Sequence, residues 1–474
     1  MGDPLYLAVD QGSHATRALI FNEEGEAIAR GFVPLSGYAP QESYSEQDPQ
    51  TVVASVHAAI EQALRTLPVS LWECIVSAAL ATQRSSIVCW DIRTGHPLSP
   101  IIGWQDRRAA GLVDRYKAHA FAVHEQTGLV LSAHYGALKM RWCLDNLPTV
   151  QNAARGGHLA MGPLASYLAF RLVEPQALIV DPANAGRTLL WDRHTHNWGP
   201  NLLRLFDINE TYLPVCTPTR YPFGALTVHG LRVPLAVITG DQGAALFSDG
   251  VPRTDTVYIN MGTGAFIQRP IGRSAIDPGP LLFSTALQDG AETIHVVEGT
   301  VNGAGSALRW AEETLPFSDL PRHIERILRA PPPRPIFINT IGGLGSPFWR
   351  TDINPTFIDD LTASREAKAA AVIESILFLI RVNLEVLRAQ TGPFSAVVIT
   401  GGLATNDALC QTLANLSGLA LRRPAEHQGT ARGLAFLAAG GPKYWPQRAA
   451  EHTFSPTPDP LLETPYQKWR SLMP

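Results

Sequence analysis

Residues 5–21 of this 474-residue chain read LYLAVDQGSHATRALIF. The apolar run 5–9 ends at Asp10, a polar turn that contains a glycine follows at 11–14, and residues 18–21 are apolar again. Two apolar runs joined by a short glycine-containing turn predict a β-hairpin. We therefore expect the carboxylate of Asp10 to lie at the turn end of the first strand.

The next segments continue the same pattern. Residues 22–26 predict a second turn, and residues 27–34 predict a third strand. Asp48 and Pro49 then predict the start of a helix, because aspartate is a good N-cap and proline fits the first helical position. Apolar residues recur at helical spacing from Val52 to Leu64.

The opening pattern recurs about 250 residues later. Residues 256–259 predict a strand, residues 260–264 (NMGTG) a glycine turn, and residues 265–268 a returning strand. Asp10-x-Gly12-Ser13 aligns with Asn260-x-Gly262-Thr263 in register. Repetition at this spacing predicts two copies of one α/β unit, with a hinge near residues 245–255; the alternative is a chance match of short patterns.

Composition limits the class of protein. Hydrophobic residues make up 45% and charged residues 17%, which predicts packed cores and excludes a largely disordered chain. The 38 basic and 42 acidic residues give a net charge of −4, without the basic excess of a nucleic-acid binder. The longest apolar helix candidate, residues 369–387, carries Glu374, Arg381 and Glu385, so we expect no membrane span.

Cysteine usage and the N-terminal residues predict a compartment. The five cysteines form no CxxC pair, and their odd number argues against a disulfide framework, so a reducing cytoplasm is expected. The first residues, MGDPLYLAVDQGS, lack the basic region of a signal peptide.

Glycine turns are the phosphate-binding features of this sequence. It contains no P-loop and no complete dinucleotide fingerprint. Glycine turns follow apolar runs at Gly12, at 262–264, at 303–305 and at 401–402. Such turns let backbone N–H groups approach phosphate oxygens, and Ser13 and Thr263 add hydroxyl donors. The alternative for each is a plain tight turn.

Two aspartates are candidates for chemistry. Asp10 could reach Mg²⁺ through water, since that ion is held by one or two carboxylates with phosphates and waters; the alternative is a turn-forming aspartate. Asp241 follows an apolar run at 235–238 and predicts a carboxylate at the mouth between a strand and a helix; the alternative is a helix N-cap. His194 and His196 favour a polar turn over a metal site.

Taken in order, these motifs resemble the FGGY carbohydrate kinases, most closely their glycerol kinase branch. The resemblance runs through almost the whole chain, and its pieces are collinear. They are residues 7–13 with Arg17, 46–49, 82–84, 104–108, Lys139 with Trp142, 240–247, 261–266, 298–299, 343–349, 400–402 with Asn406, and 429–433.

The resemblance implies an α/β fold of two RNase H-like (actin-like ATPase) domains with an interdomain cleft. Residues 1–247 would form the domain that binds a sugar or polyol, and residues 248–474 the domain that binds ATP. It also implies Mg²⁺ as a cofactor and a homodimer as the assembly, with neither nucleic acid nor membrane as a partner.

Individual roles carry over by position. Asp241 matches the general base, and Asp10 with Asp241 would stand at the metal. The acceptor pocket would be lined by Arg84, Trp104, Gln242 and Phe266. The nucleotide site would use Gly12, Ser13, Arg17, Gly262, Thr263, Gly305, Gly402 and Asn406, with Arg309 where the family has glutamine.

Three positions depart from the glycerol kinase pattern. Ser85 stands in place of a glutamate that binds glycerol hydroxyls, His134 in place of a tyrosine that contacts glycerol, and His14 in place of a phosphate-binding threonine. A pocket that hydrogen-bonds particular hydroxyls discriminates strongly when one partner is missing. Glycerol itself is therefore not expected to be the best substrate.

The sequence thus predicts a cytoplasmic, Mg·ATP-dependent kinase that phosphorylates a hydroxyl, primary by expectation, of a small polyol or sugar. One alternative within the fold is a ketose kinase similar to xylulokinase or ribulokinase, which the loss of the glutamate at Ser85 favours. Others are a non-catalytic sugar or nucleotide sensor and an ATPase of the chaperone or actin type. Retention of Asp10 and Asp241 argues against the sensor, and Arg84, Trp104 and Gln242 argue against the ATPase.

Overall fold

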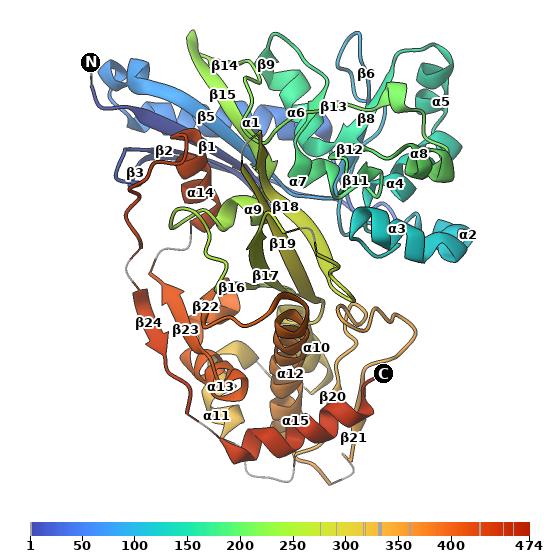
Figure 1. The fold of residues 1–474 in the computed structure, drawn as a ribbon, viewed down its shortest axis with the longest axis vertical. Helices are drawn as coiled ribbons and strands as arrows, with labels where there is room; N and C mark the ends of the chain where they lie inside the picture. The colour runs from blue at the N-terminus through green and yellow to red at the C-terminus, as the bar shows by residue number, and fades with distance from the viewer. Residues whose placement is uncertain are drawn as a thin grey trace. The chain divides into compact units, whose positions relative to one another are not determined.

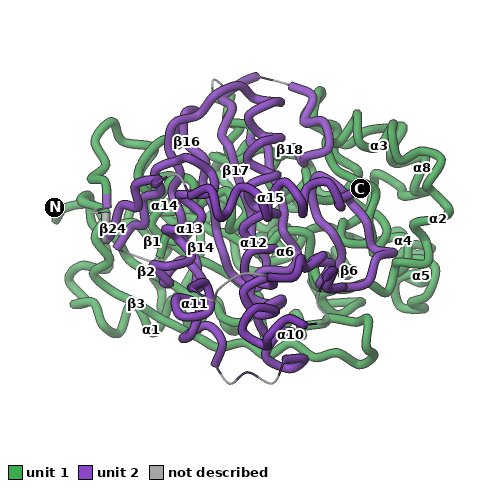
Figure 2. Tube along the Cα trace, turned by 90° about the horizontal axis from the view of Figure 1, so that it is seen from below, with its two compact units in different colours: residues 1–252, 283–295, 428–447 green, residues 253–282, 296–427, 448–474 purple. Residues whose placement is uncertain are grey.

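The computed structural model divides into two compact units (Figure 2). Unit 1 contains residues 1–252, 283–295 and 428–447, and unit 2 contains residues 253–282, 296–427 and 448–474. The structure describes residues 2–274, 276–290, 292–315, 317, 319–329, 334–359, 362–425, 428–448, 450–457 and 459–474. Residues 330–333 (APPP), whose prolines predict a surface loop, lie outside the described residues.

A seven-stranded mixed sheet forms the centre of unit 1. The predicted hairpin and third strand are confirmed as β1 (Leu5–Gln11), β2 (Ala15–Phe21) and β3 (Ala27–Pro34), paired antiparallel. Next to β1 lie β5 (Ile75–Thr82) and β15 (Leu231–Gly240), both parallel to it. The sheet is completed by β14 (Ala225–Val228) and β9 (Val173–Glu174), in the order β3-β2-β1-β5-β15-β14-β9.

Helices from distant parts of the chain cover this sheet. Helix α1 (Pro49–Thr66) and α6 (Leu164–Leu172) share one apolar core with β1, β5 and β15. Helix α14 (Gly429–Ala438), red in Figure 1, packs against β1, β2, β5 and β15 although it follows β1 by more than 400 residues. Unit 1 is therefore completed by a segment that the local sequence pattern assigns to the second half of the chain.

The predicted cap of α1 is confirmed. Asp48 is the N-cap residue, its Oδ2 accepts a hydrogen bond of 2.6 Å from Thr51 N, and Pro49 is the first helical residue. We expect Asp48→Ala to lower the free energy of unfolding by about 1 kcal/mol, because the first turn loses a partner for one of its N–H groups. Chemical denaturation of Asp48→Ala and Asp48→Asn checks this, since asparagine keeps the acceptor and should retain most of the stability; equal losses in both variants would contradict a capping role.

A smaller sheet and a helical region extend unit 1. The sheet consists of β4 (Glu46–Gln47), β7 (Ile101–Ile102), β6 (Ile87–Asp91) and β8 (Leu159–Pro163). The helices α3 (Ala120–Thr127), α4 (Gly136–Asn146), α5 (Pro148–Arg155) and α8 (Pro200–Phe206) belong to the same region. The loops that bear Trp104 and His134 join these elements.

Unit 2 repeats the central arrangement, which confirms the predicted repeat. Strands β16 (Thr256–Met261) and β17 (Ala265–Gly272) form the antiparallel hairpin, and β22 (Ala396–Thr400) and β23 (Ala420–Pro424) continue parallel to β16. The sheet order is β18-β19-β17-β16-β22-β23-β24, with β18 at Leu282–Asp289, β19 at Glu292–Val301 and β24 at Ala450–Phe454; residues 283–295 of this sheet are part of unit 1 and its other residues are part of unit 2. An antiparallel hairpin followed by two parallel strands is thus common to both sheets.

The helices of unit 2 surround a long apolar helix. Helix α12 (Arg365–Thr391) contacts α10 (Gly305–Thr314), α11 (Leu320–Leu328) and α13 (Asp407–Ser417), and the four share one core. Residues 466–472 predict a short helix, and the observed helix α15 (Pro460–Leu472) begins earlier, because Asp459 caps it and Pro460 occupies its first position. None of the helices in the described part of the chain has the length and apolar character that a bilayer span requires.

Candidate active site

The carboxyl ends of three parallel strands meet at one edge of the unit 1 sheet. Residue Ala81 of β5 pairs with Asp10 of β1 on one side and with Thr239 of β15 on the other. The residues that follow these strands therefore emerge side by side. In open α/β sheets this edge is where ligands bind. It carries Gly12 and Ser13 after β1, Gln83, Arg84 and Ser85 after β5, and Asp241 and Gln242 after β15.

Asp241 is the first residue of the short helix α9 (Asp241–Ala245), and Gly240 occupies the N-cap position. The alternative that Asp241 is the N-cap is therefore wrong by one residue. Its Oδ1 accepts a hydrogen bond of 2.8 Å from Gln242 N, and its carbonyl oxygen accepts one of 3.3 Å from Thr430 Oγ1 at the start of α14. The first contact orients the carboxylate and the second holds the backbone of Asp241 at the strand-to-helix turn.

Asp10 lies at the end of β1, nearly buried, with Arg17 Nη1 at 3.3 Å from its Oδ2. Burial, and then the negative charge of Asp241, raise the pKa of Asp10 to about 6, while Arg17 opposes the shift. Two carboxyl groups that repel each other at one sheet edge provide the oxygen ligands that Mg²⁺ prefers.

The raised pKa of Asp10, caused first by burial and then by Asp241, predicts a pH-dependent stability. Since the native pKa lies above that of an unfolded aspartate, the native state binds more protons between pH 4 and pH 6, and stability falls as the pH rises through that window. We expect Asp10→Asn to remove up to about 3 kcal/mol of this decline. Urea denaturation of both proteins from pH 4 to pH 7, without Mg²⁺ or nucleotide, measures it; parallel curves would show that Asp10 does not titrate in this range.

Side chains of Gln47, Gln83 and Trp104 form hydrogen bonds with the turn after β1. Ser13 Oγ donates to Gln83 Oε1 at 2.9 Å and accepts from Trp104 Nε1 at 3.0 Å, and Gln47 Nε2 donates to Ser13 O at 2.9 Å. The Gly12 N–H donates to Ala15 O at 3.0 Å within the turn. The Ser13 hydroxyl proposed as a phosphate donor is thus engaged with Gln83, and a phosphate would have to take that proton over. His14 is exposed.

Arg84 joins two of the strand ends. Its side-chain stem lies against Gly240, where an added Cβ would approach Arg84 Cδ to 2.5 Å. Its guanidinium donates to Gln242 Oε1. A side chain at position 240 would therefore displace Arg84 and disturb its hydrogen bond to Gln242.

Lys139 is fully buried in α4 and organises the acceptor side. Its Nζ donates to the carbonyl oxygens of Ser85, Gly103 and His134 at 2.9, 2.8 and 2.8 Å. Burial holds the pKa of Lys139 well below its usual value, and the three acceptors use all three ammonium donors. Lys139 thus connects, by hydrogen bonds, the three segments that contain Ser85, Trp104 and His134.

His134 packs edge-on against Trp104, with ring centroids 5.9 Å apart. Burial, reinforced by neighbouring cations, lowers the pKa of His134 well below its usual value. The imidazole is therefore neutral near pH 7 and can both donate and accept a hydrogen bond. Ser85, between Arg84 and the smaller sheet, has a left-handed backbone, with φ of 62°.

In unit 2, the predicted nucleotide residues gather at the equivalent sheet edge. Gly305 N donates to Gly262 O at 3.0 Å and Ser306 N to Thr263 O at 3.0 Å, which places the start of α10 on the hairpin turn. Gly401, with φ of 96°, lies where an added Cβ would come within 2.5 Å of Met261 O, so the turn that continues into Gly402 lies beside the first.

The other predicted residues of unit 2 lie close to these turns in sequence. Asn406 caps α13, its Oδ1 accepting from Leu409 N at 2.9 Å. Arg309 is exposed on α10, and Phe266 is half-buried in β17. Within unit 2 the structure brings Gly262, Thr263, Gly305 and the 401–402 turn together.

Sequence reasoning gave no role to four residues that shape the unit 1 site: Gln47, Gln83, Lys139 and Thr430. Each was part of a quoted motif, but its contact comes from another element. The hydrogen bond from Gln83 Nε2 to Gln47 Oε1, at 2.8 Å, joins segments that no local pattern relates. Of these four residues, only Lys139 gave a signal in the sequence. A lysine in a largely apolar helical segment indicates a buried ammonium group with hydrogen-bond partners, because lysine is rarely buried without them.

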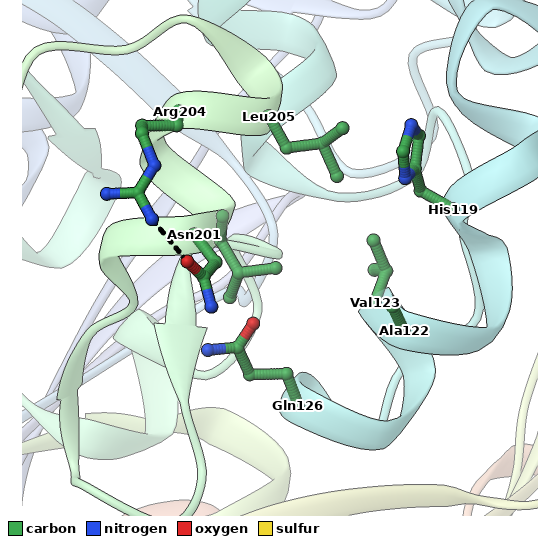
Figure 3. A pocket seen from close by; sticks show the side chains of 8 residues that line it. His119, Ala122, Val123, Gln126, Asn201, Arg204 and Leu205 are labelled. Atoms are coloured by element: carbon green, nitrogen blue, oxygen red, sulfur yellow. Dashed lines mark hydrogen bonds between the residues drawn. The ribbon is translucent and has the colours of Figure 1, made fainter.

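Two other features are not candidates. A cavity of about 340 Å³ lies between α3 and α8, lined by residues such as Val123, Gln126 and Leu205, and none of its lining residues is a carboxylate (Figure 3). His194 and His196 lie in the turn between β11 (Trp191–Asp192) and β12 (Asn197–Trp198), as expected of a polar turn. In the described ranges no cluster of three or more histidine, cysteine, aspartate or glutamate residues is arranged to hold a metal ion.

Known proteins are similar to this chain in sequence and in fold. Residues 5–248 match the model of the FGGY family of carbohydrate kinases, N-terminal domain, and residues 257–441 that of its C-terminal domain. A glycerol kinase of Pseudothermotoga lettingae is 30% identical over 99% of this chain and 98% of its own length. A Plasmodium falciparum glycerol kinase with ADP has a TM-score of 0.87 at 22% identity, over 99% of this chain and 96% of the other. A ligand-bound xylulose kinase of Lactobacillus acidophilus has a TM-score of 0.83 at 22% identity, over 99% and 96%.

The chain belongs to the FGGY family of carbohydrate kinases. It is an ATP-dependent phosphotransferase, similar to glycerol kinases, that acts on a sugar or polyol. The expected fold class, α/β with two actin-like domains, is confirmed by the two sheets and by the likeness to solved structures.

Proposed function

We propose that this kinase transfers the γ-phosphoryl group of Mg·ATP to a hydroxyl, primary by preference, of a small polyol or sugar bound at the unit 1 sheet edge. The observation that carries the proposal is the convergence of Asp10, Arg84 and Asp241 on three adjacent parallel strand ends. This edge offers an acid-base group, a cation and amides around one position.

Asp241 serves as the general base in this proposal. The acceptor hydroxyl loses its proton as its oxygen attacks the γ-phosphorus, the bond from that phosphorus to the β,γ-bridging oxygen breaks, and the proton passes to the Asp241 carboxylate. The products are ADP and a phosphate monoester. Phosphoryl transfer needs mainly positioning and charge neutralisation, so a late proton acceptor and fixed cations suffice.

Asp10 and Asp241 would hold Mg²⁺, directly or through water. The residues fit this ion, since their mutual repulsion is what a divalent cation relieves. When bound, Mg²⁺ supplies neutralisation of the charge on the transferring phosphate. Arg17, paired with Asp10, would then be released toward phosphate.

The proposed nucleotide contacts are distributed over both units. Gly12, Ser13 and Arg17 would meet phosphate from unit 1. Gly262, Thr263, Gly305, Arg309, Gly402 and Asn406 would hold the nucleotide in unit 2, supported by the adjacent glycine turns. The division at residues 247 and 248 into an acceptor-binding and an ATP-binding half stays part of this proposal.

The acceptor pocket would use Arg84, Ser85, Trp104, His134, Gln242 and Phe266. A ketose is the second candidate acceptor, because Ser85 is short and uncharged and leaves room for a larger substrate. A homodimer and a cytoplasmic location complete the proposal; the location is supported by five cysteines that are all free thiols.

The test is acceptor-dependent ADP release with glycerol, erythritol, xylitol, xylulose and ribulose, with and without Mg²⁺. We expect turnover with at least one acceptor longer than glycerol, and none without Mg²⁺. ATP binding without acceptor-dependent ADP release would overturn the proposal. Glycerol turnover as efficient as that of either ketose would remove the ketose alternative.

A further inference from the structure

Residues 181–188 form a buried turn of unit 1 that lies outside the motifs described above. The turn contains the short helix α7 (Pro182–Ala185), which Asp181 caps. The side chains of Asp181 and Asn184 are almost completely enclosed, since the two residues are 0% and 1% exposed. Neither side chain has a role in the function proposed above.

This turn contacts the middle strand of the unit 1 sheet edge. Thr82, the last residue of β5, pairs with Gln11 of β1 on one side and with Gly240 of β15 on the other. Its Oγ1 donates a hydrogen bond of 3.3 Å to Asn184 Oδ1, and both residues are buried. Helix α7 also packs against β15, whose last residue, Gly240, directly precedes Asp241. Asn184 therefore supports the strand ends beside the proposed base.

Asp181 determines which way the Asn184 amide faces. Its Oδ2 accepts a hydrogen bond of 3.1 Å from Asn184 N, and its Oδ1 accepts one of 2.8 Å from Asn184 Nδ2. Burial raises the pKa of Asp181 to about 6, while the hydrogen bonds from Asn184 oppose the shift. At pH 7 and above the carboxylate is therefore ionised and can only accept hydrogen bonds. The amide NH₂ faces Asp181, which leaves Oδ1 as the acceptor for the Thr82 hydroxyl.

The other end of the turn contacts the start of α4. Gly136 N donates to Arg187 O at 3.3 Å, and Ala137 N donates to Thr188 O at 2.6 Å. Helix α4 carries Lys139, which orders the acceptor side of the site. The turn thus joins the strand ends beside the proposed base to the helix that orders the acceptor side.

We propose that Asp181 and Asn184 are positioning residues for phosphoryl transfer. The buried turn that contains them sets the spacing between Asp241 and the loop that bears His134. This inference rests on the proposed function and adds to it two residues that are too deeply buried to touch the acceptor. The attacking hydroxyl must lie within hydrogen-bond reach of the base while the rest of the acceptor occupies its pocket. A buried network with its hydrogen bonds satisfied is suited to this task, because it makes the segments that it joins rigid.

Two variants of Thr82 test the contact with the sheet edge. Thr82→Val keeps the β-branched shape and removes the hydroxyl that donates to Asn184, whereas Thr82→Ser keeps a hydroxyl. ADP release is measured with whichever of glycerol, erythritol, xylitol, xylulose and ribulose the wild type uses most efficiently. We expect Thr82→Val to lower kcat/KM for the acceptor by about tenfold, less than the roughly 10²-fold that a displacement of 1 Å can cost. Thr82→Ser should stay within about threefold of the wild type because it keeps the hydrogen bond, and KM for ATP should be unchanged in both.

Gly136→Ala tests the other end of the turn. The added methyl group would lie 3.2 Å from Thr188 Cα and 3.3 Å from Ile87 Cγ2, so the start of α4 and its neighbours must separate by a few tenths of an ångström. We expect KM for the acceptor to rise by about 3–10-fold, although alanine is a better helix former than glycine. Loss of folded protein alone would lower the apparent kcat and leave KM unchanged. A raised acceptor KM therefore separates positioning from stability.

A matched control lies in α3. Thr127→Val removes another buried hydroxyl of unit 1, which donates to Val123 O at 2.6 Å. We expect the KM values of this variant for acceptor and ATP to equal those of the wild type. Thermal unfolding of every variant measures how much of any fall in kcat is due to lost stability.

The outcomes distinguish this inference from the function beneath it. Equal acceptor kcat/KM in Thr82→Val and Thr82→Ser, together with an unchanged acceptor KM in Gly136→Ala, would overturn the positioning role and leave the kinase proposal intact. If Thr82→Val does not fold, the acceptor KM of Gly136→Ala decides by itself. Absence of ADP release by the wild type with every acceptor would overturn the proposed function and this inference together.

Discussion

Asp241→Asn should lower kcat for phosphoryl transfer by about 10²–10⁴-fold, the usual contribution of a positioned general base. The substitution keeps the size of the side chain and an acceptor oxygen for the hydrogen bond from Gln242 N. It removes the ability to take a proton from the attacking hydroxyl. Acceptor binding should therefore change much less than kcat, which steady-state ADP release and isothermal titration measure separately.

A matched control comes from the same turn. Thr430→Val removes the hydroxyl that donates to the Asp241 backbone at 3.3 Å, while leaving the carboxylate in place. We expect it to lower kcat by less than tenfold, because only the support of the turn is weakened. Full acceptor-dependent turnover by Asp241→Asn would remove Asp241 from the chemistry and leave the sheet edge without a base.

Local patterns were sufficient for the elements that begin each half of the chain. The hairpin at residues 5–21 and the cap at Asp48 depend on neighbours within a few residues, so period and turn chemistry determine them. The repeat at residues 256–268 was visible for the same reason. The family resemblance then related Asp10, Arg84 and Asp241, which no local pattern brings together.

Long-range contacts decided what the sequence could not show. Ser13 meets Gln83 and Trp104 across 70 and 91 residues, and these bonds occupy the hydroxyl predicted to meet phosphate. Helix α14 joins unit 1 because it packs on β1 and β5, although it follows most of unit 2 in the chain. Both depend on tertiary packing, for which a strand or helix pattern carries no information.

Lys139→Met should lower the free energy of unfolding by about 2–4 kcal/mol and raise KM for the acceptor, while ATP binding changes little. Methionine matches the length of the lysine stem but leaves the carbonyl oxygens of Ser85, Gly103 and His134 without their shared donor. A buried acceptor without a hydrogen bond lowers the free energy of unfolding by about 1–3 kcal/mol. Part of this loss is offset, because the variant no longer buries an ammonium group.

The kinetic measurements test whether Lys139 also positions the acceptor, in addition to stabilising the fold. Small displacements of the loops that bear Ser85, Trp104 and His134 would misalign the acceptor hydroxyl, and a shift of about 1 Å can cost about 10²-fold in rate. Lys117→Met, at an exposed lysine of the same unit, is the control and should change stability by no more than about 0.5 kcal/mol. If Lys139→Met lost stability but kept the acceptor KM and kcat of the wild type, the three carbonyl contacts would hold the fold without positioning the substrate.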